Sequence, residues 1–454
     1  MNILIKNCNL ISMSDKKEKL EENIDILIKD GKIDKIKKNI EENVDKVIHA
    51  KGKIVMPGLI NTHVHVPMSI FRETLDGYNL QDWLEKKIWP MEDKLNIEDI
   101  YYASLLSFIE MIKTGCTTIN DMYFMTEEII KAALNSGVRL QTTQTLMDIA
   151  NDGDIRIKEF EELIKNYNDK EETITLNIGI HGFYTTNAPY IEKCANLARK
   201  YNKIVHIHFC ENSKEREDII KGYSVQSPAQ LIKKYFKGLH VVLAHSIKLT
   251  KEEIKELANE NIHISHCPVS NLKLGCGIAN ISYMLDNRIN VSIGTDGQGS
   301  GSNLDLFEAM KYTALLQKGI LEDPKQLPAY EVLKMATVNG AKALGLEQKI
   351  GTIEENKSAD LIILNLDTVI STPVNNVFSQ IVYNIKGTNV ETTIINGKIV
   401  MENRVVNGIN EKAIYQKCNE IIERIRKVVK LSIMQKVIIS DGFNTLKLGK
   451  IDIF

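Results

Sequence analysis

The chain has 454 residues, of which 43% are hydrophobic and 26% are charged, and these values are ordinary for a globular protein. A formal net charge of −2 provides no field for nucleic acid or an anionic membrane, so we expect neither as a partner. The seven cysteines are scattered without a C-x-x-C pair, and we find no signal peptide and no apolar run of about 18 residues, which predicts a cytoplasmic protein with reduced thiols.

The two ends of the chain predict one small β domain. Short strands separated by turns are expected over residues 2–10, 24–28, 32–36 and 46–50. Such a segment is too small to bury a core by itself. Similar strands are expected over residues 359–366, 382–390 and 392–401. We therefore predict a small β-sandwich built from both termini, with residues 1–55 as its first part and 348–410 as its second.

Residues 56–347 alternate strands and helices in the α/β manner. Strands are predicted over residues 55–65, 117–122, 139–147, 175–183, 204–210, 241–245, 262–267 and 290–295. Helices are predicted over residues 79–114, 126–136, 190–201, 227–235, 251–260 and 281–287. This pattern predicts a (β/α)8 TIM barrel, in which the chemistry lies at the C-terminal ends of the strands.

Histidines gather at those predicted strand ends. His63 and His65 share one face of a strand, which suits either two metal ligands or a pair of hydrogen-bonded side chains. Six of the ten histidines lie at such ends, namely His63, His65, His181, His206, His208 and His245. Because one barrel face collects them, we favour a metal site built from several strands. Strand geometry alone leaves the choice between His206 and His208 open.

Four local stretches resemble the amidohydrolase superfamily, and within it the 5′-methylthioadenosine/S-adenosylhomocysteine deaminases and related chlorohydrolases. They are PGLINTHVHVPM (57–68), DWL with PME (82–84 and 90–92), HCPVSNLKL (266–274) and GTDG leading into NLDLFE (294–297 and 303–308). The resemblance extends to about residue 410.

The resemblance implies one metal ion per subunit, usually zinc, with iron or manganese as alternatives. Its implied ligands are His63, His65, His208 and Asp296. The family pattern His-x-x-Glu selects His208, which leaves His206 as a supporting neighbour. Two-metal members use a modified lysine on strand four, but this strand ends in His181, so we expect a single metal.

The implied reaction is hydrolytic deamination of an adenine nucleoside to the inosine product and ammonia. A metal lowers the pKa of bound water towards about 7. By resemblance, Glu211 shuttles the proton, His245 orients the water and stabilises developing charge, and Asp296 joins metal binding with a hydrogen bond to that water.

Substrate contacts also follow from the resemblance. Glu92 would bind the ribose hydroxyls, while Trp83, His181 and Ser300 would contact the nucleoside. Arg156 matches an arginine that meets a substrate carboxylate in homocysteine-accepting relatives. Their second arginine is replaced here by Gln144, which weakens such a clamp and favours uncharged 5′ groups, as in methylthioadenosine, 5′-deoxyadenosine or adenosine, over S-adenosylhomocysteine.

Two alternative functions and the chain end complete the expectations. One alternative is deamination or dechlorination of another heterocycle (guanine, a pterin or a triazine), but such a substrate has no ribose for Glu92 to bind. A non-catalytic scaffold on the same barrel would be expected to lose ligands, and all are present. We expect a homo-oligomer by analogy with other barrel enzymes. Residues 411–454 are predicted to form an amphipathic helix over 413–431, then an extra tail in which 433–454 alternates as a hairpin or association edge would.

Overall fold

The computed structural model describes residues 1–454 except 15–17, 75, 168–169, 259 and 441–454, and it describes side chains as far as residue 430. Strands from both ends of the chain form one nine-stranded sheet, which confirms the predicted β domain built from both termini. Its order is β19-β18-β17-β16-β5-β1-β2-β3, with β4 paired to β1. The strands are β1 (Ile3–Leu10), β2 (Glu21–Lys29), β3 (Lys32–Lys37), β4 (Lys46–His49), β5 (Ile54–Pro57), β16 (Leu361–Leu364), β17 (Val390–Ile395), β18 (Lys398–Glu402) and β19 (Val405–Val406).

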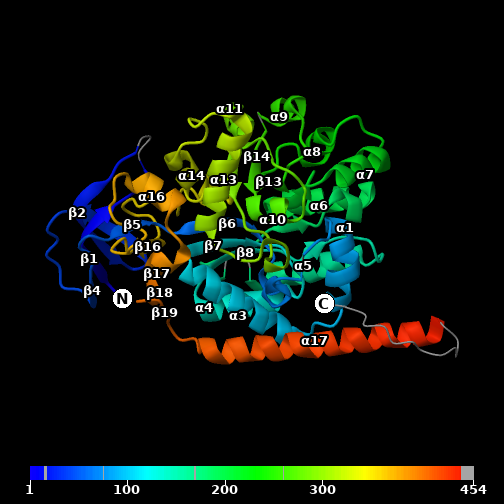
Figure 1. Ribbon diagram of the computed structural model, residues 1–454, viewed down its shortest axis with the longest axis horizontal. Coiled ribbons are helices and arrows are strands. Elements are labelled where there is room, and N and C mark those ends of the chain that lie inside the picture. The colour runs from blue at the N-terminus through cyan, green and yellow to red at the C-terminus, as the bar shows by residue number, and fades with distance from the viewer. Residues whose placement is uncertain (15–17, 75, 168–169, 259, 441–454) are drawn as a thin grey trace.

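The sheet joins the two terminal segments through the pairing of β5 with β16. That pairing is antiparallel, and Val55 lies opposite Ile363. Apolar side chains of both segments, such as Ile5, Val55 and Ile363, belong to one buried cluster. Figure 1 shows this sheet at the left, with the blue and the orange strands side by side. Neither segment therefore has to bury its apolar face alone.

The middle of the chain forms the predicted barrel. Its strands are β6 (Leu59–Val64), β7 (Cys116–Asp121), β8 (Arg139–Thr142), β9 (Thr145–Leu146), β10 (Ile174–Leu176), β11 (Ile178–Ile180), β12 (Val205–Phe209), β13 (Val241–His245), β14 (Ile262–His266) and β15 (Asn290–Ile293). Because β8–β9 and β10–β11 are each one interrupted barrel strand, the described strands occupy the eight expected positions. The barrel closes between β15 and β6, where the Thr62 hydroxyl donates to the Ile293 carbonyl at 3.0 Å.

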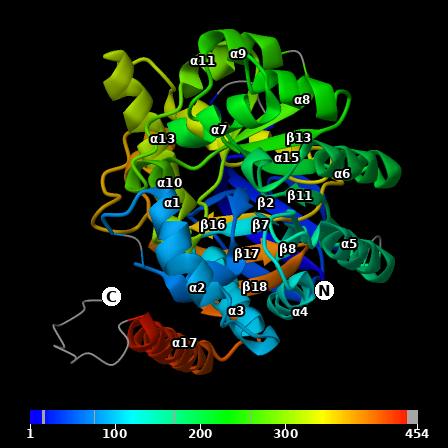
Figure 2. The same ribbon diagram turned by 90° about the vertical axis from the view of Figure 1, so that its right-hand side faces the viewer.

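Helices cover the outside of the barrel (Figure 2). The helices of the described part of the chain, including the buried one-turn helix α12 at the site, are α1 (Leu80–Trp83), α2 (Trp89–Glu92), α3 (Ile97–Lys113), α4 (Thr126–Ser136), α5 (Gly153–Tyr167), α6 (Ala188–Tyr201), α7 (Ser213–Tyr223), α8 (Ala229–Phe236), α9 (Lys251–Leu257), α10 (Pro268–Lys273), α11 (Ile281–Asp286), α12 (Gln298–Gly301), α13 (Leu306–Leu321), α14 (Ala329–Met335), α15 (Val338–Ala343), α16 (Val377–Tyr383) and α17 (Glu411–Ser440). Short 3-10 turns occupy Val66–Phe71, Phe183–Thr185 and Gly387–Asn389, and a π-helical turn, Leu84–Ile88, joins α1 to α2. No helix in the described part of the chain is both long and apolar enough to span a membrane.

Two predicted elements differ from the structure in the first half. The strand predicted over residues 55–65 is divided at Gly58, with β5 in the terminal sheet and β6 in the barrel. A Cβ atom at Gly58 would lie 2.1 Å from the Thr117 hydroxyl oxygen, so only glycine fits this crossing. The helical region predicted over 79–114 consists of α1, the π-helical turn, α2 and the longer α3.

Two further predictions are wrong near the C-terminus. The strand predicted over residues 382–390 is replaced by the end of α16 and a 3-10 turn. The hairpin suggested for 433–454 is wrong for 433–440, because α17 continues as a helix to Ser440. Residues 441–454 lie outside the described residues. The described part of α17 lies along α3, and Glu411 pairs with Lys113 at 2.8 Å (Figures 1 and 2).

Candidate active site

Four side chains from three barrel strands converge at the C-terminal face. His63 lies near the end of β6, and His65 directly follows that strand. His208 lies on β12, and Asp296 follows β15. One ring nitrogen from each histidine lies within 4.8 Å of the others. The His65 Nε2 atom is 3.2 Å from His208 Nε2 and 3.2 Å from Asp296 Oδ1, and His63 Nε2 is 3.6 Å from the same oxygen. Ligand atoms about 2.1 Å from a tetrahedral metal lie about 3.4 Å apart, so this spacing fits a metal ion.

Backbone carbonyls orient two of these histidines. The Nδ1 atom of His65 lies 2.6 Å from the Met122 carbonyl, and Nδ1 of His208 lies 2.6 Å from the His181 carbonyl. A carbonyl can only accept, so each Nδ1 carries the proton and donates it. The Nε2 lone pair of each ring is therefore directed at the site, as metal coordination requires.

His63 provides the third ring nitrogen. Its Nε2 atom is buried and has no hydrogen-bond partner among the described residues, an arrangement that a bound metal would satisfy. Burial lowers the pKa of His63 to about 3 and keeps the ring neutral. The His63 Nδ1 atom lies 2.9 Å from Nε2 of His206, so His206 lies beside a predicted ligand as the neighbour that the sequence suggested.

Three donors hold the Asp296 carboxylate. Ser270 and Ser300 donate their hydroxyl protons to Oδ2 at 2.5 and 2.8 Å, and the Gly297 N–H donates to Oδ1 at 2.8 Å. Burial alone would raise the pKa of Asp296, but contacts with the neighbouring histidines outweigh burial and hold that pKa well below its usual range. Ser300 is therefore bonded to a predicted metal ligand, whereas the sequence predicted a substrate contact.

Glu211 and His245 face each other beside this cluster. Their Oε2 and Nε2 atoms are 3.8 Å apart. The His245 Nδ1 atom lies 2.8 Å from the side-chain oxygen of Asn271, which can only accept, so Nδ1 carries the proton and Nε2 faces the site as an acceptor. Burial raises the pKa of Glu211, which brings its protonated form closer to neutral pH.

A second buried carboxylate holds the backbone that carries Glu211. The Glu215 side chain accepts hydrogen bonds from the N–H groups of Cys210 at 3.0 Å and of Glu211 at 2.6 Å. Burial, followed by the nearby Glu211 charge, raises the pKa of Glu215 to about 7. Cys210 has a φ of 51°, a left-handed conformation that is uncommon for a residue other than glycine. Glu215 thus secures a strained turn at the reaction centre.

A cavity of about 540 Å³ opens above the cluster. Of the predicted substrate residues, Trp83, Glu92, Arg156 and His181 line it, as do His65, His208, Glu211, His245 and Asp296. Apolar side chains make up much of the remaining wall, including Met68, Leu80, Ile88, Leu95, Met122, Phe124, Met125, Met147 and Ile149. The volume and the mixture of apolar wall with a few convergent polar groups are typical of a small-molecule site.

Two predicted substrate residues do not line this cavity in the described structure, namely Gln144 and Ser300. The Gln144 amide donates to Glu159 at 2.5 Å and its oxygen accepts from Thr126 at 3.0 Å, so both ends are engaged away from the cavity. Arg156 lines the cavity, but its Nε atom is paired with Asp152 at 2.7 Å.

Glu92 and Trp83 also line the cavity. Tyr123 donates its hydroxyl proton to Oε1 of Glu92 at 2.5 Å, and burial raises the pKa of Glu92 to about 7. Trp83 is only 3% exposed, and its indole N–H lies 3.4 Å from the Thr74 hydroxyl. Trp83 therefore combines a packed position with a face on the cavity.

Sequence reasoning missed several residues of the site. Ser270 and Asn271 stand in the HCPVSNLKL stretch that carried the resemblance, so that motif was the available signal for their contacts. Tyr123 and Glu215 lie in loops or helix starts beside predicted residues, and no spacing rule distinguishes them from ordinary surface residues.

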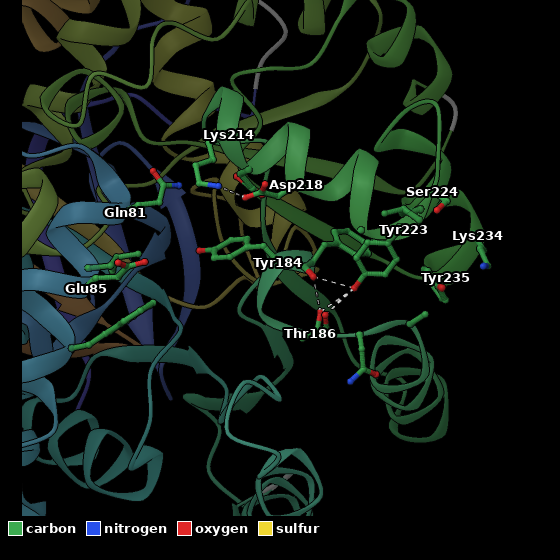
Figure 3. A pocket seen from close by; sticks show the side chains of 18 residues that line it. Gln81, Glu85, Tyr184, Thr186, Lys214, Asp218, Tyr223, Ser224, Lys234 and Tyr235 are labelled. Carbon is green, nitrogen blue, oxygen red and sulfur yellow. Dashed lines mark hydrogen bonds and ion pairs between the residues drawn. The ribbon is translucent and has the colours of Figure 1, made fainter.

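A neighbouring cavity of about 630 Å³ lies behind the wall formed by Leu84, Trp89 and Tyr184, which line both cavities. Figure 3 shows its side chains, with Lys214 paired to Asp218 and Tyr223 bonded to the Thr186 segment. Its lining mixes two lysines with three acidic residues, Glu85, Glu215 and Asp218, and one of those lysines is already paired with Asp218.

Comparisons with known proteins agree with this geometry. Residues 54–400 match the amidohydrolase family. The chain is similar to a 5′-deoxyadenosine deaminase of Methanobrevibacter smithii, with 42% identity over 433 residues that cover 94% of this chain and 99% of that protein. It is 38% identical to a 5-methylthioadenosine/S-adenosylhomocysteine deaminase of Caldanaerobacter subterraneus subsp. tengcongensis over 435 residues, or 95% and 99% of the two chains. The crystal structure of an adenosine deaminase from Xanthomonas campestris with bound zinc superposes with a TM-score of 0.90 at 27% identity, covering 94% and 98% of the two chains.

Proposed function

The chain belongs to the amidohydrolase family, and we propose that it is a metal-dependent aminohydrolase that converts the 6-amino group of an adenine nucleoside to the oxo group of the inosine product, with release of ammonia. The observation that carries this function is the convergence of three histidines, the Asp296 carboxylate and Glu211 at one cavity. Relatives that are 42% and 38% identical are named as deaminases of adenine nucleosides, which supports the same substrate class here.

A divalent metal is the cofactor, and we propose one zinc ion per subunit held by His63, His65, His208 and Asp296. Three imidazoles and one carboxylate are a donor set that suits zinc. Bound there, the metal would supply Lewis-acid activation of water at neutral pH. The zinc-bound adenosine deaminase with a similar fold supports this assignment.

Glu211 moves the proton in the proposed reaction. Its carboxylate takes a proton from the attacking water and gives it to N1 of the purine ring, and it then relays the proton of the new C6 hydroxyl to the amine, so that the C6–N bond breaks, ammonia leaves and C6 becomes an oxo group. The His245 Nε2 lone pair accepts a hydrogen bond from the water and directs its attack on C6, while Asn271 keeps the His245 tautomer that this requires.

We further propose that uncharged 5′ groups are preferred over the amino-acid tail of S-adenosylhomocysteine. Arg156 is paired with Asp152, so a substrate carboxylate would have to compete with an existing ion pair. Gln144 is bonded to Glu159 and does not complete a clamp. Methylthioadenosine, 5′-deoxyadenosine and adenosine carry no carboxylate that needs one.

A purified, metal-loaded preparation tests this function through ammonia release. The panel holds adenosine, 5′-deoxyadenosine, methylthioadenosine, S-adenosylhomocysteine, guanine and an aminotriazine, with Glu211→Gln as the inactive control. We expect turnover of the uncharged nucleosides and a loss of about 10²- to 10⁴-fold in the variant. Activity on a bare heterocycle alone would reject the nucleoside assignment. S-adenosylhomocysteine as the best substrate would reject the argument from Arg156.

The cellular setting is also a proposal. All seven cysteines are free thiols, which supports a reducing cytoplasm. The predicted homo-oligomer stays a prediction, which sedimentation of the full-length protein can test.

A further inference from the structure

A tyrosine that sequence reasoning did not identify is bonded to the proposed ribose-binding carboxylate. Tyr123 lies just beyond the end of β7, and Glu92 is the last residue of α2. Both residues line the cavity. The Tyr123 hydroxyl donates to Glu92 Oε1 at 2.5 Å. Such a hydroxyl-to-carboxylate hydrogen bond is among the stronger ones when the acceptor is ionised.

The protein fixes Tyr123 firmly. The Tyr123 carbonyl accepts from the Thr145 N–H at 2.9 Å and from the Thr145 hydroxyl at 2.7 Å. Its ring stacks on Phe124 with the centroids 4.1 Å apart, and the residue is 4% exposed. The hydroxyl therefore has little freedom to leave the Glu92 carboxylate.

Glu92 needs such a donor because of its surroundings. Burial raises the pKa of Glu92 to about 7, and the neighbouring Asp93 charge works in the same direction. The Tyr123 hydrogen bond and the His65 ring oppose burial by favouring the carboxylate form. A protonated Glu92 would lose an acceptor that faces the ribose.

We propose that Tyr123 is a positioning residue that holds the Glu92 carboxylate oriented for the ribose 2′ and 3′ hydroxyls and thereby makes the enzyme selective for ribonucleosides. The inference rests on the proposed function, because it takes Glu92 as the ribose contact. A site built to hydrogen-bond substrate hydroxyls discriminates strongly against analogues that lack them. Without the Tyr123 hydroxyl, Glu92 can rotate or bind a proton, and that discrimination should fall.

The test compares Tyr123→Phe with wild type on adenosine and on 2′,3′-dideoxyadenosine, which share the base and the 5′ hydroxyl. A hydrogen bond to a charged group accounts for roughly a ten- to hundredfold effect. We expect kcat/KM for adenosine to fall by that factor, mainly through KM, with a change of less than about threefold for the dideoxy analogue. Tyr201→Phe is the matched control, because Tyr201 donates to Glu161 at 2.8 Å on the surface between α6 and α5.

A double-mutant cycle with Glu92→Gln separates a positioning role from a structural one. If Tyr123 acts through Glu92, the second substitution adds less than about threefold to the first. Equal losses on both substrates, or losses that multiply in the double variant, would overturn the inference. Absence of adenosine turnover by metal-loaded wild type would instead reject the proposed function, so the two failures are distinguishable. Metal content and melting temperature of each variant identify any general loss of folding.

Discussion

Replacing Ser300 by alanine distinguishes a metal-supporting serine from a substrate-binding one. The Ser300 hydroxyl donates to Asp296 Oδ2 at 2.8 Å, and Ser270 donates to the same oxygen at 2.5 Å. Both serines are fully buried, so water does not readily replace a lost hydroxyl. Without Ser300, Asp296 keeps Ser270 and the Gly297 N–H but loses one of two donors on Oδ2.

The size of the effect follows from the charge on Asp296. A hydrogen bond to a charged group contributes about 1.5–3 kcal/mol, and about 1.4 kcal/mol corresponds to a tenfold change in an equilibrium constant. Ser300→Ala should therefore weaken metal binding by about ten- to hundredfold, which is the usual effect of losing a group that orients a ligand. The double variant Ser270→Ala/Ser300→Ala should weaken it further, because Oδ2 then has neither hydroxyl.

Competition with a chromophoric chelator measures the metal affinity directly. Steady-state kinetics at saturating metal then gives KM for the nucleoside, which we expect to change little. Ser282→Ala is the matched control, because the buried Ser282 hydroxyl has no partner among the described residues. An unchanged metal affinity with a raised KM would refute this reasoning and return Ser300 to the substrate role that the sequence predicted.

Three further outcomes test other parts of the structure. Arg139→Met should destabilise the protein by about 3–5 kcal/mol in denaturant titrations, because it leaves Asp360 buried without its partner at 2.7 Å. Burial raises the pKa of Asp360, but Arg139 outweighs burial and lowers that pKa. The pair therefore stabilises the fold above a pH of about 4, and this stabilisation is lost as the pH falls through the folded-state pKa of Asp360. Equal acid sensitivity of the wild type and the variant would contradict this. Removing the metal by dialysis against a chelator should abolish ammonia release and lower the free energy of unfolding by about 4 kcal/mol relative to protein at a metal concentration of a thousand times Kd, as read by calorimetry. Glu215→Gln should lower kcat about tenfold with unchanged metal content, because an amide N–H2 cannot accept from the N–H of Cys210 or Glu211, and an unchanged kcat would show that the turn holds itself.

The fold was predictable wherever periodicity and end signals agree. Thr126–Ser136 and Val241–His245 were predicted with the bounds they have in the structure. Gly137 directly follows the last residue of α4 and has a left-handed conformation, which is a usual signal for the end of a helix. A strand was wrongly predicted over residues 382–390 because the apolar residues of this segment suit a strand as well as a helix. Tertiary packing decides there, because α16 begins with an Asn376 cap, buries Phe378 and Ile381, and packs against α13 and α14.

The site was predictable where a strand fixes the direction of a side chain. His63 and His65 were identified because residues two apart on a strand share a face and strand ends meet at one edge of the barrel, whereas His208 was chosen over His206 by the His-x-x-Glu pattern of the family. The contacts of Ser300 and Gln144 were not, since Ser300 lies in the one-turn helix α12 and Gln144 at the interruption between β8 and β9, where the segments are too short for a period to set the side-chain direction. The structure places the Ser300 hydroxyl against Asp296, and its substrate contact stays a prediction.

The backbone is strained at the C-terminal ends of three barrel strands that form the site. Cys210, His245 and Asp296 have φ angles of 51°, 69° and 62°, in the left-handed region that residues other than glycine seldom occupy. Each such residue raises the free energy of the folded state by about 1–3 kcal/mol, so the surrounding barrel must hold it in place. At His245 and Asp296 this conformation occurs at the residue whose side chain faces the reaction centre, and at Cys210 it immediately precedes Glu211. Glycine would adopt these angles without strain but would supply neither imidazole nor carboxylate, so the strain at positions 245 and 296 is the consequence of placing reactive groups there.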